Sequence, residues 1–231
     1  MRGAFGHSLH DNYPYIYDTV LKIGEQGSTP TPLVISVPYP SKGEYKAGEA
    51  LTFYITLLGT ACVYEAEIID AAKYMCKGKF DHAQLVDYQQ VYSHHWSDEG
   101  AAHIPHCDTL TVNFLTPAEI FVQGKTTTQL DFALFIDRLF GRISGIIDSF
   151  GESEFVLPYH LIVNKPYVTA RYDLRTVKFQ TNNQPVIGIY GSVQYFGDVT
   201  RYLPYVDLGS QIHIGKKTSR ACGEYCFEIG I

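Results

Sequence analysis

The chain has 231 residues, of which 45% are apolar and 18% charged, so it is a folded protein rather than a disordered one. No apolar run is long enough to cross a membrane, the N-terminus lacks the layout of a signal peptide, and five cysteines without a C-x-x-C pair indicate neither a disulfide framework nor a zinc ribbon. The net charge of −6 argues against a simple nucleic-acid-binding protein, and we expect a soluble, cytoplasmic protein of one large or two small domains.

The first half of the chain predicts two helices and three strands. Residues 2–10 form a short helix with Phe5 and Leu9 on one face, and Pro14 ends it. The later elements are strands at 33–37 and 51–58, an amphipathic helix at about 64–75, and an alternating strand at 83–92. This order, α-β-β-α-β, is that of a ferredoxin-like unit that lacks its initial strand.

The second half predicts a complete unit of the same kind. Its strongest helix covers residues 130–147, where apolar residues form one wide face. The other elements are strands at 110–115, about 167–179, 186–196 and 225–229, and a helix at 202–212. The order β-α-β-β-α-β is the ferredoxin-like arrangement. We therefore predict an α+β fold of tandem ferredoxin-like domains, the first in residues 1–108 and the second in residues 109–231.

One pattern occurs in both halves, 138 residues apart. A strand ends at Gly59, Tyr64 follows five residues later, and a helix comes next. In the second half the strand ends at Gly197, Tyr202 follows at the same spacing, and again a helix comes next. A repeated unit of this size indicates two related domains rather than one large sheet.

Six short segments carry a resemblance to a known family. They are RGAFG at 2–6, LLG at 57–59, FLTP at 114–117, DF at 131–132, the strand at 188–197 and HIGK at 213–216. Their order resembles that of the CRISPR repeat-processing endoribonucleases of the RAMP superfamily, over nearly the whole chain. Each segment is short and partly structural, so the specificity lies in their order and spacing.

The resemblance implies two ferredoxin-like domains side by side that bind CRISPR repeat RNA and cut it once per repeat. The implied reaction needs no metal ion or other cofactor: a 2′-hydroxyl attacks the adjacent phosphate and leaves a cyclic phosphate and a free 5′-hydroxyl. Such chemistry requires a general base, an acid for the leaving oxygen, and cations or N–H donors for the phosphate. Histidine suits the first two roles because it titrates near neutral pH.

Three residues near the N-terminus are the candidates for catalysis. The family's catalytic histidine commonly comes from the first helix or the loop after it, so His10, beside Asp11, is the first choice. His7 lies on a neighbouring position of the same helix face, and Tyr13 follows as a group that can hydrogen-bond the phosphate or stack on a base. The simpler alternatives are solvated histidines and a packing tyrosine.

The candidate RNA-binding residues lie in a basic segment. Between Asn164 and Arg220, eight basic residues stand against three acidic ones, a net charge of +5 that leaves −11 for the remainder. This distribution is typical of a local phosphate-binding face, although surface scatter is the alternative. The candidates are Arg171 and Arg175 on one face of a strand, His213 before a loop, and Lys216, Lys217 and Arg220 within it.

The chain departs from the family at the glycine-rich loop before the last strand. Lys217 and Ala221 occupy positions where the resemblance leads us to expect glycine. This departure and the acidic balance favour a second hypothesis: a non-catalytic RAMP subunit that binds the repeat within a guide-RNA effector complex. An RNA binder of the RRM type ranks last, because the expected strands carry no clear aromatic motif.

Two further expectations concern partners. The three-stranded first sheet would leave an unpaired edge, and we expect a partner chain, a second copy in a homodimer, or residues 38–48 to cover it. The polar segment at 93–108 carries potential metal ligands at His94, His95, His103, His106 and Cys107, with Asp98 and Glu99 between them. Their spacing matches no zinc pattern, so we predict no metal site.

Overall fold

The second half of the chain forms a four-stranded antiparallel sheet in the computed structural model, which describes residues 2–23, 29–38, 44–78, 84–89, 106–151, 157–180 and 185–230. The strands are β3 (Thr109–Ala118), β6 (Thr169–Gln180), β7 (Pro185–Phe196) and β8 (Tyr225–Gly230), in the order β6-β7-β3-β8. Each neighbouring pair is antiparallel. The first and third strands of the unit are therefore central, as the ferredoxin-like arrangement requires.

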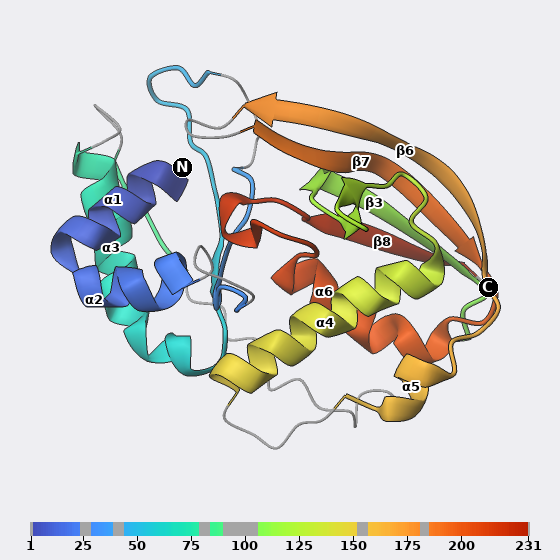
Figure 1. Cartoon of the computed structure of the whole chain (residues 1–231). Coiled ribbons are helices and arrows are strands. Elements are labelled where there is room, and N and C mark those ends of the chain that lie inside the picture. The colour runs from blue at the N-terminus through green and yellow to red at the C-terminus, as the bar shows by residue number, and fades with distance from the viewer. Residues whose placement is uncertain are drawn as a thin grey trace.

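Two helices cover one face of this sheet, as Figure 1 shows: α4 (Phe132–Phe150) and α6 (Leu203–Ile212). Alternate residues of the central strands point toward them and are buried, for example Val112 and Val193. The smaller elements of this half are the hairpin of β4 (Phe121–Val122) and β5 (Lys125–Thr126), and the short helix α5 (Tyr159–Val163). The core of this half is a single apolar cluster of residues from Cys107 to Tyr225.

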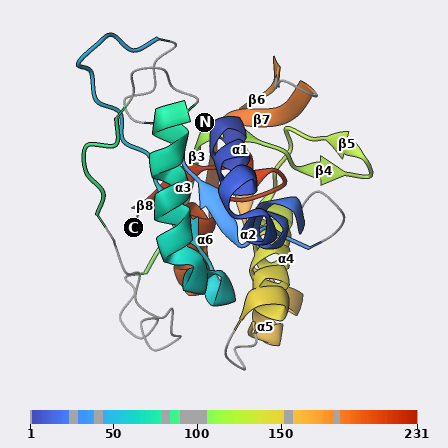
Figure 2. The same cartoon turned by 90° about the vertical axis from the view of Figure 1, so that its left-hand side faces the viewer.

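The first half has a smaller core of its own. Its elements are α1 (Arg2–Asn12), α2 (Pro14–Tyr17), the π-helix η1 (Asp18–Lys22), the antiparallel strands β1 (Leu33–Ile35) and β2 (Ile55–Leu57), and α3 (Glu65–Gly78). Figure 2 shows α1 and α3 lying side by side, and buried Phe5 and Leu9 belong to the cluster that joins them. Pro14 begins α2, so the predicted helix break at this point is confirmed.

The pattern that occurs twice in the sequence has a backbone basis in both halves. Gly59 has φ +56° and begins the 3-10 helix η3 (Gly59–Tyr64), which leads directly into α3. Gly197 has φ +140° and is followed by the 3-10 helix η5 (Thr200–Tyr202), which leads into α6. Both positions have the positive φ that favours glycine. The shared design supports the tandem ferredoxin-like fold, whereas the domain boundary between residues 108 and 109 stays a prediction.

The two halves touch through specific groups. The carboxylate Oε2 of Glu224 accepts a hydrogen bond from the backbone N–H of Val37 at 3.0 Å. A Cβ atom at Gly59 would lie 1.9 Å from the backbone oxygen of Phe150, so the end of α4 packs directly on this glycine. Leu58 packs against the core of the second half. These contacts fix how the first half sits beside the larger sheet.

The strand predicted at residues 83–92 is wrong for the part that the structure describes. Residues 84–89 have no regular secondary structure and lie against α3, where Lys73 Nζ stands 5.4 Å from the ring centre of Tyr88. Residues 84–89 pair with none of the described strands and pack on α3 instead. Residues 39–43, part of the segment expected to cover the sheet edge, lie outside the described residues.

Within the described residues, no helix has the length and apolar character needed to span a membrane.

Candidate active site and nucleic-acid interface

His7 and His10 lie on the exposed face of α1, opposite the side that packs on α3. The His10 side chain is 59% exposed, and its Nδ1 atom lies 3.4 Å from Oδ1 of Asp11. Its ring meets the ring of Tyr17 edge-on at 5.2 Å between centres. An exposed imidazole with a carboxylate beside one nitrogen can present its other nitrogen to a substrate.

Tyr13 holds the end of α1 against α3. Its hydroxyl donates a hydrogen bond of 2.7 Å to Oδ2 of Asp70. This bond, reinforced by burial and by the negative charge of Asp70, raises the pKa of Tyr13 to about 12. The phenol therefore stays neutral and its proton is already donated. Such a tyrosine is better suited to positioning the helix than to transferring a proton.

The loop at residues 213–223 keeps the backbone of a glycine-rich loop. Lys217 and Ala221, where glycine is expected, have φ +61° and +58°. Gly215 and Gly223 also have positive φ, and a Cβ atom at Gly223 would lie 1.8 Å from the backbone oxygen of Ile214. A left-handed conformation costs an ordinary residue roughly 1–2 kcal/mol. The departure in sequence is therefore not a departure in backbone shape.

The cations of this loop differ in what they contact. Lys217 Nζ donates to Oε1 of Glu119 at 2.8 Å, and Glu119 is 6% exposed. The exposed Lys216 places its Nζ 5.5 Å from the ring centre of Phe121, and its N–H donates to the backbone oxygen of Glu119. Arg220 is partly buried in the turn η6 (Thr218–Arg220). Lys217 thus anchors the loop, whereas Lys216 is accessible to a phosphate.

His213 lies inside the protein, with 3% exposure. Burial, together with the charge of Arg142, lowers its pKa to about 4, against a hydrogen bond with the backbone of Cys222. The imidazole is therefore neutral at physiological pH and does not lie on the surface. Its contact with RNA, predicted from its place before the loop, stays a prediction, and in this arrangement its side chain is shielded from the surface.

The strand register places the two arginines of β6 at different distances from the loop. Thr176 pairs with Ile189 of β7, Ile189 pairs with Ala118 of β3, and the next residue, Glu119, bridges to Lys216. Arg175, beside Thr176, therefore lies at the loop end of the sheet, about 15 Å from Lys216 at ordinary strand spacing. Its guanidinium lies 5.6 Å from the ring centre of Tyr190.

Arg171 lies further along β6, opposite Gln194 of β7. It is exposed and on the same face of the strand as Arg175, since the two are four residues apart. That spacing is about 13 Å along the strand, away from the loop. The structure therefore brings Arg175 toward the loop cations and leaves Arg171 at a distance from them.

Three further exposed cations are not among the predicted RNA-binding residues, although Lys178 is counted in the basic segment. Lys125 lies on the β4–β5 hairpin. Arg138 on α4 donates from Nη2, at 2.6 Å, to the backbone oxygen of Phe121, the residue whose ring Lys216 contacts. Lys178 extends β6 past the end of β3. Lys125 and Arg138 lie outside the basic segment, so charge counting could not find them. The Gln123-Gly124 pair, which takes positive φ at both turn residues of the hairpin, was the available sequence signal for Lys125.

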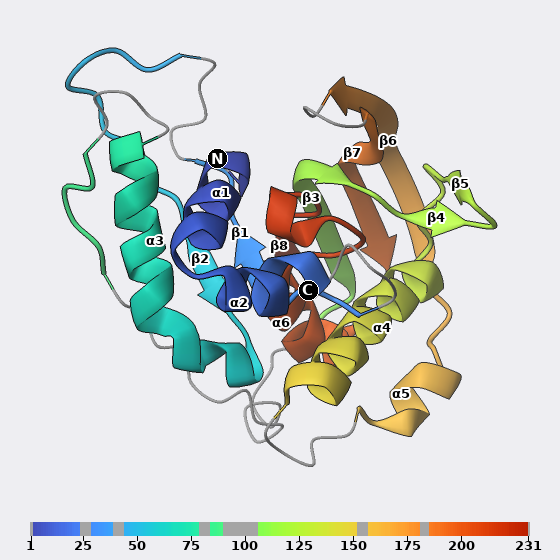
Figure 3. The ribbon, with the colours of Figure 1, turned by 60° about the vertical axis from the view of Figure 1, so that its left-hand side comes forward.

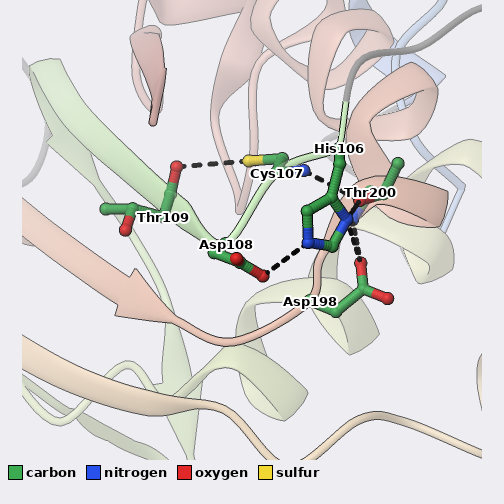
Figure 4. Close-up of polar contacts among 6 residues, drawn as sticks. All are labelled: His106, Cys107, Asp108, Thr109, Asp198 and Thr200. Carbon is green, nitrogen blue, oxygen red and sulfur yellow. Dashed lines mark hydrogen bonds and ion pairs between the residues drawn. The ribbon is translucent and has the colours of Figure 1, made fainter. Parts of the chain in front are cut away.

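The polar segment before β3 places His106 between two carboxylates, as Figure 4 shows. Its Nε2 lies 2.9 Å from Asp108 and its Nδ1 lies 3.9 Å from Asp198 and 3.3 Å from Oγ1 of Thr200. Because the two nitrogens face different carboxylates, these groups do not converge on one point.

The rest of this segment offers little to a metal ion in the part that is described. The thiol of buried Cys107 donates to the backbone oxygen of Thr109. Among the described residues, no group of three or more His, Cys, Asp or Glu side chains is placed to hold a metal ion. The other potential ligands, at positions 94, 95, 98, 99 and 103, lie outside the described residues.

The α1 histidines and the loop cations belong to different halves of the molecule. In Figures 1 and 3 the segment after α6 lies between the N-terminal helices and the four-stranded sheet. The turn η6 of this segment contacts β1. The loop is thus placed at the junction of the two halves.

Comparison with known proteins finds family models that match each half of the chain. The model of a family described as the CRISPR-associated endoribonuclease Cas6 matches residues 112–225, and the model of an N-terminal domain matches residues 1–99. No curated protein matches the chain significantly.

Solved structures share the fold over almost the whole chain. The product complex of Thermus thermophilus Cas6 (TTHB231) is 16% identical, with a TM-score of 0.62 over 98% of this chain and 92% of that one. The product complex of a Cas6 (TTHA0078) is 19% identical, with a TM-score of 0.58 over 98% and 91%. A chain of a partial Cas6-RT-Cas1–Cas2 complex is 13% identical, with a TM-score of 0.59 over 100% of this chain and 43% of that one.

The fold is the tandem ferredoxin-like fold, as predicted. The predicted resemblance to the CRISPR repeat-processing endoribonucleases is confirmed by the Cas6 family model, which matches residues 112–225.

Proposed function

We propose that this protein binds CRISPR repeat RNA and cleaves it without a metal ion, through attack of a 2′-hydroxyl on the adjacent phosphate. The observation that carries the proposal is the exposed His10 on the first helix of a Cas6-type fold, with Asp11 at one ring nitrogen. Histidine can take the proton of the attacking hydroxyl or supply one to the leaving 5′-oxygen. His7, on the same exposed face, is the second candidate for these roles, and Tyr13 supports the helix that carries both.

The phosphate needs positive charge and N–H donors, and the loop at 213–223 supplies them in this proposal. Lys216 is exposed, and Arg175 lies at the same end of the sheet. Arg220 and Lys217 add charge, with Lys217 already held by Glu119, and Arg171 extends the basic strand. Backbone N–H groups of a loop in glycine-type conformations form concave sites for anions. The site requires no cofactor.

The alternative is a non-catalytic RAMP subunit that holds the repeat within a guide-RNA complex. In the sequence, the substituted glycine loop favoured this alternative. The positive φ of Lys217 and Ala221 weakens that reason, because the loop keeps its glycine-type shape. The acidic net charge of −6 still favours it. Other subunits and a second copy of this chain remain candidate partners.

Incubation of the protein with repeat RNA in EDTA, followed by a denaturing gel, tests the proposal. We expect one cut per repeat, at a rate that added Mg²⁺ does not change. Binding of the repeat without any cut would favour the alternative, and cleavage that depends on Mg²⁺ would exclude the proposed mechanism. Loss of all repeat binding would exclude both.

A further inference from the structure

Arg142 is a charged residue in the core of the second domain. It projects from α4, is 8% exposed, and donates from Nε to the backbone oxygen of Ile212 at 2.8 Å. None of the described carboxylates pairs with it, and its Nη2 atom has no hydrogen-bond partner within the described chain. Ile212 ends α6, so the guanidinium lies at the negative end of that helix dipole. Burial lowers the pKa of Arg142 to about 10, which leaves it charged at neutral pH.

His213 follows Ile212 directly and also carries a buried polar atom without a hydrogen-bond partner in the described ranges. Its Nδ1 atom is buried and has no partner in the part of the chain that the structure describes, while the ring bonds the backbone of Cys222. A neutral imidazole has one N–H donor and one acceptor nitrogen. With the proton directed to the carbonyl group of Cys222, Nδ1 is an acceptor. It stands close enough to Arg142 for the guanidinium charge to act on it.

These observations join into one buried polar connection. Arg142 holds the carbonyl group that precedes His213, and His213 reaches Cys222 at the other end of the loop. His213 has φ +60°, an unfavourable conformation for a non-glycine residue, so other contacts must maintain it. Nη2 of Arg142 and Nδ1 of His213 both stay buried without a hydrogen-bond partner among the described residues, so the fold bears the desolvation cost of both.

We propose that Arg142 and His213 are positioning residues that clamp both ends of the loop at 213–223, each through a backbone carbonyl group. The clamp sets the loop shape that presents Lys216 to the RNA, so this inference rests on the proposed function. It also makes the loop sensitive to acid. Protonation of His213 would place a second positive charge beside Arg142 in the core.

Amide hydrogen exchange of the loop in the RNA-free protein tests the clamp. In Arg142→Met we expect exchange of residues 214–223 to be at least tenfold faster than in the wild type, with α4 and β3 unchanged. Arg201→Met, which removes an exposed arginine before α6, should leave loop exchange unchanged. Equal loop exchange in the wild type and Arg142→Met would overturn the inference.

His213 variants keep the test independent of whether Arg142→Met folds. Asparagine has one donor and one acceptor and tolerates positive φ, so His213→Asn should keep slow exchange, whereas His213→Leu should lose it. Below pH 6.5 the wild-type loop should open progressively toward pH 4, and the asparagine variant should not. The same pH profile in both proteins would contradict the role of His213.

RNA binding separates this inference from the proposed function. We expect Arg142→Met and His213→Leu to bind repeat RNA about tenfold more weakly, a loss near 1.4 kcal/mol, and His213→Asn to bind normally. Faster loop exchange in these variants with unchanged RNA affinity would overturn the inference that the clamp supports RNA binding. If the wild type itself does not bind the repeat, the proposed function fails, while the exchange results still decide the clamp.

Discussion

His10 is the residue on which the proposed cleavage depends. Loss of a general acid or base typically slows a reaction about 10²–10⁴-fold, so we expect His10→Ala to slow cleavage by this factor with nearly unchanged RNA affinity. His160→Ala, which removes an exposed histidine of α5, is the matched control and should cleave normally. The measurement is single-turnover cleavage with a parallel binding assay. Full activity of His10→Ala would remove this residue from the site, and His7 would be tested next.

Ala221 tests the backbone shape of the loop at the same scale. In the left-handed region an L-residue is strained by roughly 1–2 kcal/mol, while glycine has a larger entropy loss on folding of roughly 0.5–1 kcal/mol. We therefore expect Ala221→Gly to be neutral to about 1 kcal/mol more stable in urea unfolding. Ala66→Gly, on the exposed face of α3, should instead be about 1 kcal/mol less stable. A loss of stability in both would show that Ala221 does not have a glycine-type conformation.

At the scale of the element, two neighbouring lysines of the loop have different expected roles: Lys217 anchors the loop and Lys216 binds RNA. Lys217→Ala removes the partner of Glu119, which is 6% exposed, and an unpaired buried carboxylate should lower the free energy of unfolding by about 2 kcal/mol. Lys216→Ala removes an exposed charge, so stability should hold while RNA binding weakens and its salt dependence falls by about one counterion. Urea unfolding and a salt series measure the two effects. Equal RNA binding by the wild type and a Lys216→Ala/Lys217→Ala double variant would place the RNA elsewhere.

Some elements follow from the sequence because their own residues determine them. The helix predicted at 130–147 is α4, since its wide apolar face has to be buried, and the Gly-to-Tyr spacing marks two equivalent strand-to-helix turns. The strand expected at 83–92 depended on a neighbour that the alternation pattern could not supply. Strand patterns predict a strand only where another strand is available for pairing.

The candidate site was less predictable than the fold, because its contacts join distant parts of the chain. Lys217 meets Glu119 from 98 residues away, and this pairing changes it from a surface cation into an anchor. His213 is buried by a helix end and by Arg142, which no local pattern links to it. By contrast, the exposure of His7 and His10 follows from the helical periodicity of α1.

At the scale of the whole molecule, the cationic loop of the second half lies at the junction with the first half, which carries the histidine helix. Glu224 bonds to Val37 across that junction, and β1 contacts the turn η6. In the proposed function, a bound RNA would span both halves and contact both the histidine helix and the loop. The acidic remainder of the surface would keep the RNA on this basic region.

The 2′-hydroxyl attack is the central claim, and one substituted RNA tests it directly. A repeat RNA with a single 2′-deoxy nucleotide on the 5′ side of the cleavage position keeps its phosphates but lacks the nucleophile. In EDTA, we expect the protein to bind this RNA as tightly as the all-ribose repeat, to cut only the all-ribose repeat, and to leave a cyclic phosphate. Cleavage of the deoxy-substituted RNA at the same position, or failure to cut either RNA, would contradict the proposed reaction.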